Sequence, residues 1–320
     1  MIERQLTFRL LEVYKMVIDT GSVSESARIL HLTQPTISKQ LKRLQEAVGE
    51  PLYVVHQQRI MPTDAGYALY NLCNNVFGEV ADFKSALVEM RQGAAGHCKI
   101  AMVNTAQYVL PRLLGPYSKA YPNVELTVEI GNRQQVLERF EQGLDDIYVF
   151  SHPPSLEHAT AGRFLLNPLV VVAAKNDPLS KKARVTWEDV KSARFLLREP
   201  GSATRMMFDS VLQSRGLTIS DSIQMASNEA IRTGVASGMG LALLSQHVIQ
   251  GYEQQIDVLN IDGFPLESHW HFIVRNDRYL SKASRGFLKY TDINIEACLG
   301  KVWAEHGMEA LLTDINRLGV

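Results

Sequence analysis

The stretch SESARILHLTQPTISKQLKRLQ, residues 24–45, decides the fold of the first part of this 320-residue chain. Residues 24–30 have the pattern of a short helix, and the small side chain of Ala27 would let a second helix approach closely. Thr33 is placed to cap that second helix, with Pro35 in its first turn, where a missing N–H costs nothing. The second helix continues with apolar residues at helical spacing, namely Ile37, Leu41, Leu44 and Val48. The stretch therefore predicts two helices joined by a tight turn.

A further helix and a hairpin flank this helix pair. Residues 6–20 place apolar side chains on roughly one helical face, which predicts a preceding helix, and Ser22 or Ser24 can cap the one that follows. Residues 52–55 and 60–61 predict two short strands joined by a polar tip, which is the geometry of a wing. The segment is predicted to be a winged helix-turn-helix; the alternative is a generic three-helix bundle with solvated polar faces.

The exposed face of the second helix of the pair carries side chains suited to DNA. Glutamine can pair with N6 and N7 of adenine and lysine with the acceptors of guanine, while serine and threonine reach phosphates or base edges. Arg59, in the hairpin, can enter the adjacent minor groove. From Arg28 to Arg59 five basic residues face two acidic ones, although the whole chain has a net charge of −1; this local excess suits phosphates. The predicted DNA-binding residues are Gln34, Pro35, Thr36, Ser38, Lys39, Lys42 and Arg59.

Residue identities in this region resemble the DNA-binding signature of LysR-type transcriptional regulators. The resemblance rests on residues 24–45, 46–53 and 62–66, with a departure at 53–56, where the family usually has phenylalanine and an acidic–basic pair. It implies a sequence-specific transcriptional regulator whose partner is double-stranded DNA. It also implies a homodimer, with a tetramer built from two dimers as the family expectation, and RNA polymerase as a further candidate partner.

A long helix is predicted after the wing. Apolar residues recur from Leu69 to Met90 in alternating steps of four and three, the heptad pattern of a helix that pairs with a second helix. Packing within the same chain is the alternative. The Gly-Ala-Ala-Gly run that follows has no side chain able to fix an orientation, so it predicts a hinge. The predicted dimer contacts are Leu69, Val76, Val80, Phe83 and Leu87.

Beyond the hinge, short apolar strands alternate with helical patterns, which implies βα units and parallel sheets. The pattern falls into two sets, so two α/β lobes linked by two crossing strands, as in periplasmic binding proteins, fit better than one sheet. The last residues predict two short amphipathic helices. The predicted domains are a DNA-binding domain at 1–66, a linker helix at 67–92, a hinge at 93–97, an effector-binding domain at 98–293 and a helical tail at 294–320.

Polar residues at strand and helix ends of the two lobes predict a site for a small anionic metabolite. Residues 201–204 open a helix, whose free N–H groups and dipole attract negative charge. Strand ends of open α/β lobes face the ligand cleft, and a histidine there can add positive charge at low pH. For each residue the alternative is a helix cap or a satisfied loop residue. The predicted effector-binding residues are Thr105, Asn132, His152, Ser202, Thr204 and Asn228.

The second part of the chain is similar to the sensor domain of a narrower LysR branch, which includes activators of Calvin-cycle carbon-fixation operons. The similarity covers most residues from 98 to about 291, and three departures stand out: Ser151-His152 in place of Gly-Arg, an unusually polar stretch at 145–148, and Ala203 in place of a common glycine. The motifs that carry it are at residues 131–133, 152–154, 198–205, 227–231, 238–245 and 262–265.

Several functions are disfavoured by what the sequence lacks. No apolar run is long enough to span a membrane and no secretion signal is present, so a cytoplasmic location is expected. The three cysteines are far apart, and His269 and His271 have no third ligand nearby, so no metal is expected. No nucleophile elbow, P-loop or dinucleotide loop occurs, so the chain is predicted not to be an enzyme and to need no cofactor. The alternative is a small-molecule binding protein or enzyme whose N-terminal module only dimerises.

Overall fold

The computed structural model describes residues 5–57, 59–92, 96–153, 155 and 157–317. Contacts divide the chain into two compact units. Residues 1–84 with 142–144 form the first, here called the N-terminal unit, and residues 85–141 with 145–320 form the second, here called the α/β unit.

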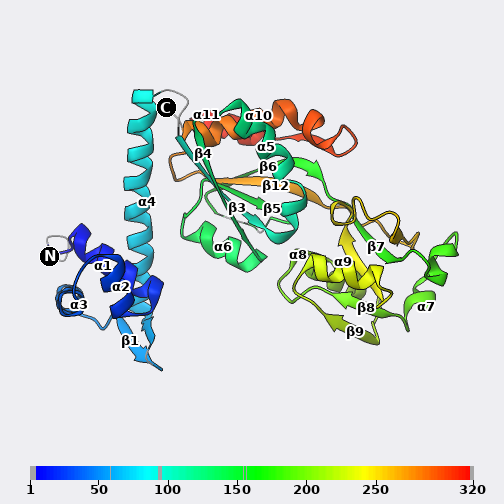
Figure 1. Ribbon diagram of the computed structural model, residues 1–320, viewed down its shortest axis with the longest axis horizontal. Helices are drawn as coiled ribbons and strands as arrows, with labels where there is room; N and C mark the ends of the chain where they lie inside the picture. Colours follow the sequence, from blue (N-terminus) through cyan, green and yellow to red (C-terminus); the bar gives the residue numbers. More distant parts are fainter. Residues whose placement is uncertain (1–4, 58, 93–95, 154, 156, 318–320) are drawn as a thin grey trace. The chain divides into compact units, whose positions relative to one another are not determined.

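The N-terminal unit contains the elements that the sequence predicts. They are α1 (Phe8–Thr20), α2 (Val23–Ile29), α3 (Gln34–Val48), β1 (Tyr53–His56), β2 (Arg59–Pro62) and α4 (Asp64–Gln92). Ser22 rather than Ser24 caps α2, since its side chain accepts from the backbone N–H of Glu25. Thr33 precedes α3 but makes no capping bond, because its hydroxyl is 2.8 Å from that of Thr36. The long helix α4 runs well past α1–α3 (Figure 1).

The start of α4 is held against the hairpin by a close backbone contact at Gly66. A Cβ atom added to Gly66 would lie 1.9 Å from the backbone oxygen of Leu52 and 2.6 Å from the hydroxyl of Tyr14. That same Leu52 oxygen accepts hydrogen bonds from the Tyr14 hydroxyl (3.0 Å) and from the backbone N–H of Thr63 (3.2 Å). Because glycine has no Cβ, Gly66 allows the start of α4 to pack directly against the hairpin backbone and the Tyr14 side chain of the core.

The α/β unit consists of two lobes, each built on one sheet. Lobe I has the sheet order β13-β6-β12-β5-β3-β4, and lobe II has the order β11-β7-β10-β8-β9. The strands of lobe I are β3 (Gly96–Val103), β4 (Val124–Gly131), β5 (Ile147–Phe150), β6 (Ala159–Leu166), β12 (His269–Arg275) and β13 (Ala304–Gly307). The strands of lobe II are β7 (Leu169–Ala174), β8 (Arg194–Leu197), β9 (Asp221–Gln224), β10 (Leu241–Ser245) and β11 (Ile256–Val258).

Helices cover both sheets, and in lobe I α10 and α11 lie on one face with α6 on the other (Figure 1). The helices of lobe I are α5 (Pro111–Ala120), α6 (Arg133–Glu141), α10 (Lys282–Leu299), α11 (Glu309–Arg317) and the 3-10 turn η2 (Asn104–Tyr108). Those of lobe II are α7 (Trp187–Val190), α8 (Ala203–Ser214), α9 (Asn228–Ala236) and the 3-10 turns η3 (Pro178–Lys181) and η4 (Gln246–Val248).

The sheets are mixed, which corrects the prediction of parallel sheets. In lobe I, β4, β3 and β5 are parallel, but β12 pairs antiparallel with both β5 and β6. In lobe II, β9, β8 and β10 are parallel, and β7 is antiparallel to β10. Of these antiparallel strands, β7 and β12 follow the two crossings between the lobes, whereas β13, at the edge of lobe I, also runs antiparallel to its neighbour β6. A local βα repeat therefore does not set the direction of these strands.

Two crossing segments join the lobes, as predicted. Leu166–Leu169 leads from β6 into β7, and Leu266–His269 leads back into β12. They are hydrogen-bonded to each other: the N–H of Asn167 donates to the oxygen of Ser268 (2.7 Å), and Leu169 and Leu266 exchange both backbone bonds at 2.9 Å. The crossing is thus a two-stranded ribbon.

The C-terminal tail differs from the predicted pair of short helices. Residues 294–299 complete α10, residues 304–307 form strand β13, and α11 follows. The strand forms because β6 would otherwise be the open edge of the sheet, whose backbone groups need partners. Gly162 in β6 lets α11 approach, since a Cβ there would lie 2.8 Å from the Leu311 side chain.

The polar stretch at 145–148, unusual for the branch it resembles, has structural partners. The Asp145 carboxylate is almost fully buried and accepts two 2.8 Å bonds from Arg139. Asp146 accepts from the backbone N–H of Lys99 and from the hydroxyl of Ser284, each at 2.8 Å. These carboxylates fasten α6, β3 and α10 to the start of β5.

Candidate DNA-binding face and ligand cleft

Helix α3 presents the predicted DNA-reading residues on its outer face. Gln34, Pro35, Ser38, Lys39 and Lys42 are exposed, and Thr36 is half-buried beside Thr33. The opposite face is closed, because it packs into the core through Ile37, Leu41 and Leu44. The helix is therefore anchored on one side and leaves its polar side free for a groove of DNA.

Arg59 begins the second hairpin strand and is exposed. Its stem lies against the end of α1, since a Cβ atom added to Gly21 would be 2.8 Å from Arg59 Cγ. The backbone N–H of the next residue, Ile60, donates to the oxygen of Gly21 (2.9 Å). The hairpin is thus fixed to α1, and with it the position from which Arg59 can reach a phosphate or a groove.

The predicted dimer seam of α4 divides into two parts. Leu69 is buried in the core of the N-terminal unit, and Val76 packs against that core, so their apolar faces are used within the chain. This corrects the assignment of Leu69 to a dimer contact. Val80 and Leu87 are half-buried, whereas the Phe83 side chain is 64% exposed.

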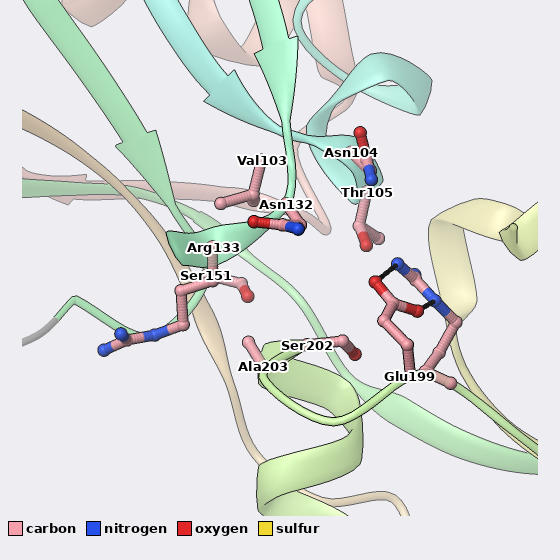
Figure 2. A pocket seen from close by; sticks show the side chains of 10 residues that line it. Val103, Asn104, Thr105, Asn132, Arg133, Ser151, Glu199, Ser202 and Ala203 are labelled. Atoms are coloured by element: carbon pink, nitrogen blue, oxygen red, sulfur yellow. Dashed lines mark hydrogen bonds and ion pairs between the residues drawn. The ribbon is translucent and has the colours of Figure 1, made fainter. Parts of the chain in front are cut away.

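A cleft between the lobes brings together strand ends of lobe I and the start of α8 in lobe II (Figure 2). It is lined by Val103, Asn104, Thr105, Asn132, Arg133, Ser151, Arg198, Glu199, Ser202 and Ala203. The cavity is small, ≈ 20 Å³, room for about one water molecule. The lobes are therefore closed around a polar site.

Three of the predicted effector residues line this cleft: Thr105, Asn132 and Ser202. Ser202 is the N-cap of α8, where its side chain accepts from the N–H of Arg205. Asn132 accepts through Oδ1 from the N–H of Gln135 (2.9 Å) at the start of α6. Ser202 and Asn132 therefore do cap helices, which was the alternative to a ligand-binding role, and both side chains also border the cleft.

Asn228 lies directly beside the cleft, whereas His152 and Thr204 face elsewhere. Thr204 is buried against the interior of lobe II, because it is two residues beyond Ser202 and therefore turned about 200° around the helix axis. His152 lines a separate cavity of ≈ 450 Å³, whereas Ser151, its neighbour in sequence, lines the cleft. These two assignments are corrected accordingly.

The strongest charges of the cleft were not among the predicted residues. Arg198 is buried, and its guanidinium donates to both oxygens of Glu199 at 2.8 and 2.9 Å. Its Nη1 donates to Oδ1 of Asn228 (2.6 Å), and Asn228 Nδ2 donates to the Thr105 hydroxyl (3.1 Å). A continuous polar chain therefore crosses from lobe II to lobe I. The position of Arg198 at the carboxyl end of a predicted strand was the signal that could have found it.

Arg133 lies at the lobe I side of the cleft. Its Nε is buried and has no hydrogen-bond partner among the described residues, and Nη2 donates weakly to the oxygen of His152 at 3.5 Å. Burial lowers the pKa of the Arg133 guanidinium below its usual value. Figure 2 shows its guanidinium extending away from Ser202, so its stem lines the cleft.

The lobes also meet beside the cleft at the first turn of α9. Gln107 donates to Oε1 of Glu229 at 3.0 Å, and the Tyr108 hydroxyl donates to the same oxygen. Burial alone would raise the pKa of Glu229, but hydrogen bonds from Tyr108 and Ser227 hold it below its usual value. This contact joins η2 of lobe I to α9 of lobe II.

The histidine pair of β12 has local partners. Nδ1 of His269 is 2.8 Å from the Glu305 carboxylate, and Nδ1 of His271 donates to the oxygen of His269 (3.0 Å). Burial lowers the pKa of His271. No group of three His, Cys, Asp or Glu residues that could hold a metal occurs in the part of the chain described. Within that same part, no helix is both long and apolar enough to cross a membrane.

A winged helix-turn-helix joined to a two-lobed α/β unit with a polar cleft defines a class of protein, the DNA-binding transcription regulators that carry an effector-binding domain. Residues 8–67 match the model for the bacterial regulatory helix-turn-helix protein, lysR family, and residues 91–292 match the LysR substrate binding domain. The chain belongs to the LysR family of transcriptional regulators and is not an enzyme.

The relatives found by sequence are regulators of the LysR branch that includes activators of Calvin-cycle operons. The chain is 34% identical to the HTH-type transcriptional activator CmpR of Synechocystis over 92% of this chain and 97% of that protein. It is 32% identical to a RuBisCO operon transcriptional regulator of Acidithiobacillus ferrooxidans over 90% of this chain and 94% of that protein.

Solved structures agree with the fold. The regulatory domain of Synechocystis CcmR in complex with 2-PG aligns with a TM-score of 0.58 and 31% identity, covering 64% of this chain and 98% of that one. A full-length OxyR variant from Pseudomonas aeruginosa aligns with a TM-score of 0.69 over 94% of this chain and 98% of that one. Its 19% identity supports the fold alone.

Proposed function

We propose that this regulator is gated by a small anionic metabolite bound between its lobes, at Thr105, Asn132, Ser202 and Asn228. The observation that carries the proposal is the convergence of these side chains with the Arg198 guanidinium and the first turn of α8 on one cleft. Helix N–H groups and guanidinium groups are both donors to anions. The related CcmR domain was solved with 2-PG, which is 2-phosphoglycolate. This supports a phosphorylated carboxylate as the first compound to test.

A ligand there would bias the balance between two arrangements of the lobes. The chain Arg198–Asn228–Thr105 connects the lobes, so a ligand that uses these groups has different contacts in the closed and open arrangements. Coupling to DNA of roughly 1–3 kcal/mol is the usual size of such effects, and by linkage operator DNA must change ligand affinity by the same factor. The hinge predicted at residues 93–97 would pass this bias, but Gly96 and His97 begin β3 and pair with β4. Residues 93–95 lie outside the described residues.

The effector proposal predicts that Thr105→Val weakens binding of 2-phosphoglycolate by roughly tenfold, because it deletes a hydroxyl that bridges the lobes at nearly constant volume. Isothermal titration calorimetry on the full chain measures it. Thr204→Val is the matched control: its side chain faces the interior of lobe II, so affinity is expected to stay unchanged. An equal loss of affinity in both variants would contradict the assignment of this cleft as the effector site.

The DNA-binding assignment predicts that Gln34→Ala and Lys39→Ala lose discrimination between operator and unrelated DNA. Each removes a side chain from the exposed start of α3, and a good base contact contributes about 1–3 kcal/mol of discrimination. Competition binding against random-sequence DNA measures it, with Lys84→Ala on the exposed surface of α4 as control. Base preference unchanged in both α3 variants would rule out α3 as the reading helix.

We further propose a homodimer that pairs along α4 through Val80, Phe83 and Leu87. The support is the exposure of Phe83, a large apolar side chain on a helix with a heptad pattern. We also propose that two such dimers assemble into a tetramer. Contact with RNA polymerase and a cytoplasmic location are further parts of this proposal. The domain boundaries at 1–66, 67–92, 93–97, 98–293 and 294–320 stay proposals as well.

A further inference from the structure

We propose that Glu199 is a built-in carboxylate that occupies the Arg198 guanidinium and is displaced by the anionic ligand. This inference rests on the proposed function, because it concerns how that ligand enters the cleft. The Glu199 carboxylate accepts two bonds from the Arg198 guanidinium, and Figure 2 marks both as dashed lines at Glu199. A carboxylate held in this way has the charge and the paired oxygens that a bound oxyanion would have.

Arg198 is fixed in place before any ligand arrives. Its side chain is 3% exposed, and Nη1 is held by Asn228 at 2.6 Å. Its own backbone oxygen accepts from Nη1 of Arg205 (3.1 Å), which secures the strand end from the other side. A guanidinium with a fixed plane binds carboxylate or phosphate through two parallel bonds with little loss of entropy. The receptor half of the ion pair is therefore rigid.

Glu199 is the movable half. Its side chain is 17% exposed, against 3% for Arg198, and it borders the cleft. With Glu199 in place the cavity is ≈ 20 Å³, far below the roughly 300 Å³ or more typical of metabolite sites. Rotation of Glu199 toward solvent would free both space and positive charge at the same spot. A metabolite needs both, so this single movement opens the site.

The exchange explains which ligands the cleft would accept. Leaving a buried guanidinium without a counter-ion is costly, so Glu199 departs only if another anion replaces it. A neutral analogue offers no such replacement and would be excluded even if it fitted. The ligand class is an oxyanion with two acceptor oxygens, either a phosphate monoester or a carboxylate. Because Arg198 is hydrogen-bonded to Asn228, and Asn228 to Thr105, an exchange of anions at Arg198 would alter the hydrogen-bonded contact with lobe I.

The test is Glu199→Gln, which removes the charge and keeps the shape. Titration calorimetry of the full chain with 2-phosphoglycolate and with inorganic phosphate is expected to show affinity for at least one probe raised by at least about tenfold, because a nearby negative charge is gone. Without ligand, the variant is expected to melt at a lower temperature than the wild type, and phosphate is expected to raise its melting temperature by more. A purely structural role for Glu199 would lower stability without raising affinity.

Glu188→Gln is the matched control, since it removes the same charge from an exposed site of lobe II outside the cleft. An equal affinity gain in this control would mean a general charge effect and overturn the inference. If the wild type binds a probe and Glu199→Gln binds it equally or more weakly, Glu199 is not displaced and the proposed function still stands. If neither protein binds either probe, both the inference and the anionic ligand fall.

Discussion

Replacing Gly66 with alanine is expected to destabilise the N-terminal unit by about 3 kcal/mol or more, because the added Cβ would lie 1.9 Å from a backbone oxygen. Neither α4 nor Leu52 can move aside cheaply, since the Leu52 oxygen also holds Tyr14 and Thr63. The helix start or the hairpin must then leave its position. Operator DNA binding should be lost together with this packing.

Differential scanning calorimetry of the full chain measures the effect, with ligand titration showing that the α/β unit is still folded. Gly115→Ala is the matched control: a Cβ at Gly115, inside α5, meets no atom within 4 Å, so the change should be neutral or slightly stabilising. A Gly66→Ala protein that melts and binds DNA like the wild type would show that α4 does not need this close approach.

Replacing Arg139 with leucine is expected to cost about 3–5 kcal/mol in the stability of lobe I, because it leaves a buried carboxylate without its partner. Asp145 has a side chain that is 1% exposed and takes both of its 2.8 Å charged bonds from Arg139. Arg139 is itself more open, at 31%. The loss therefore comes from the stranded charge more than from lost packing.

The double variant Arg139→Leu, Asp145→Asn separates these two causes. It removes both charges, so it should recover a large part of the stability lost in the single variant. Urea denaturation of the three proteins at one pH gives the comparison. If the double variant is no more stable than Arg139→Leu, the buried carboxylate is not the source of the loss.

Local rules predicted the N-terminal unit well, because its elements depend on nearby residues. The helical spacing of Ile37, Leu41 and Leu44 and the turn at Gly21 fix α1–α3 without reference to distant parts of the chain. Strand direction in the α/β unit is a different matter. It depends on which strands pair across more than a hundred residues, as β12 does with β5 and β6, and no local pattern reports such pairing.

The cleft was predicted in part, for reasons that lie in side-chain direction. Ser202 and Thr105 follow from the position of helix and strand ends alone. Thr204 was assigned to the cleft because it is close to Ser202 in sequence, although 100° of helical rotation per residue turns it inward. Arg198 and Glu199 were missed because a charged pair in sequence is usually solvated, and only the fold shows this one to be largely buried.

The strand β13 changes the mechanics of the crossing between the lobes. Leu166, at the end of β6, donates its N–H to the oxygen of Trp303 (2.8 Å) and accepts from Nε2 of His247 in η4 (2.8 Å). The rings of Trp303 and His247 lie 5.0 Å apart, so the tail touches lobe II as well as lobe I. Bending the crossing must strain these contacts together. The tail therefore restrains bending at the crossing and favours one angle between the lobes. A ligand that opens or closes the lobes must supply the free energy needed to distort these contacts.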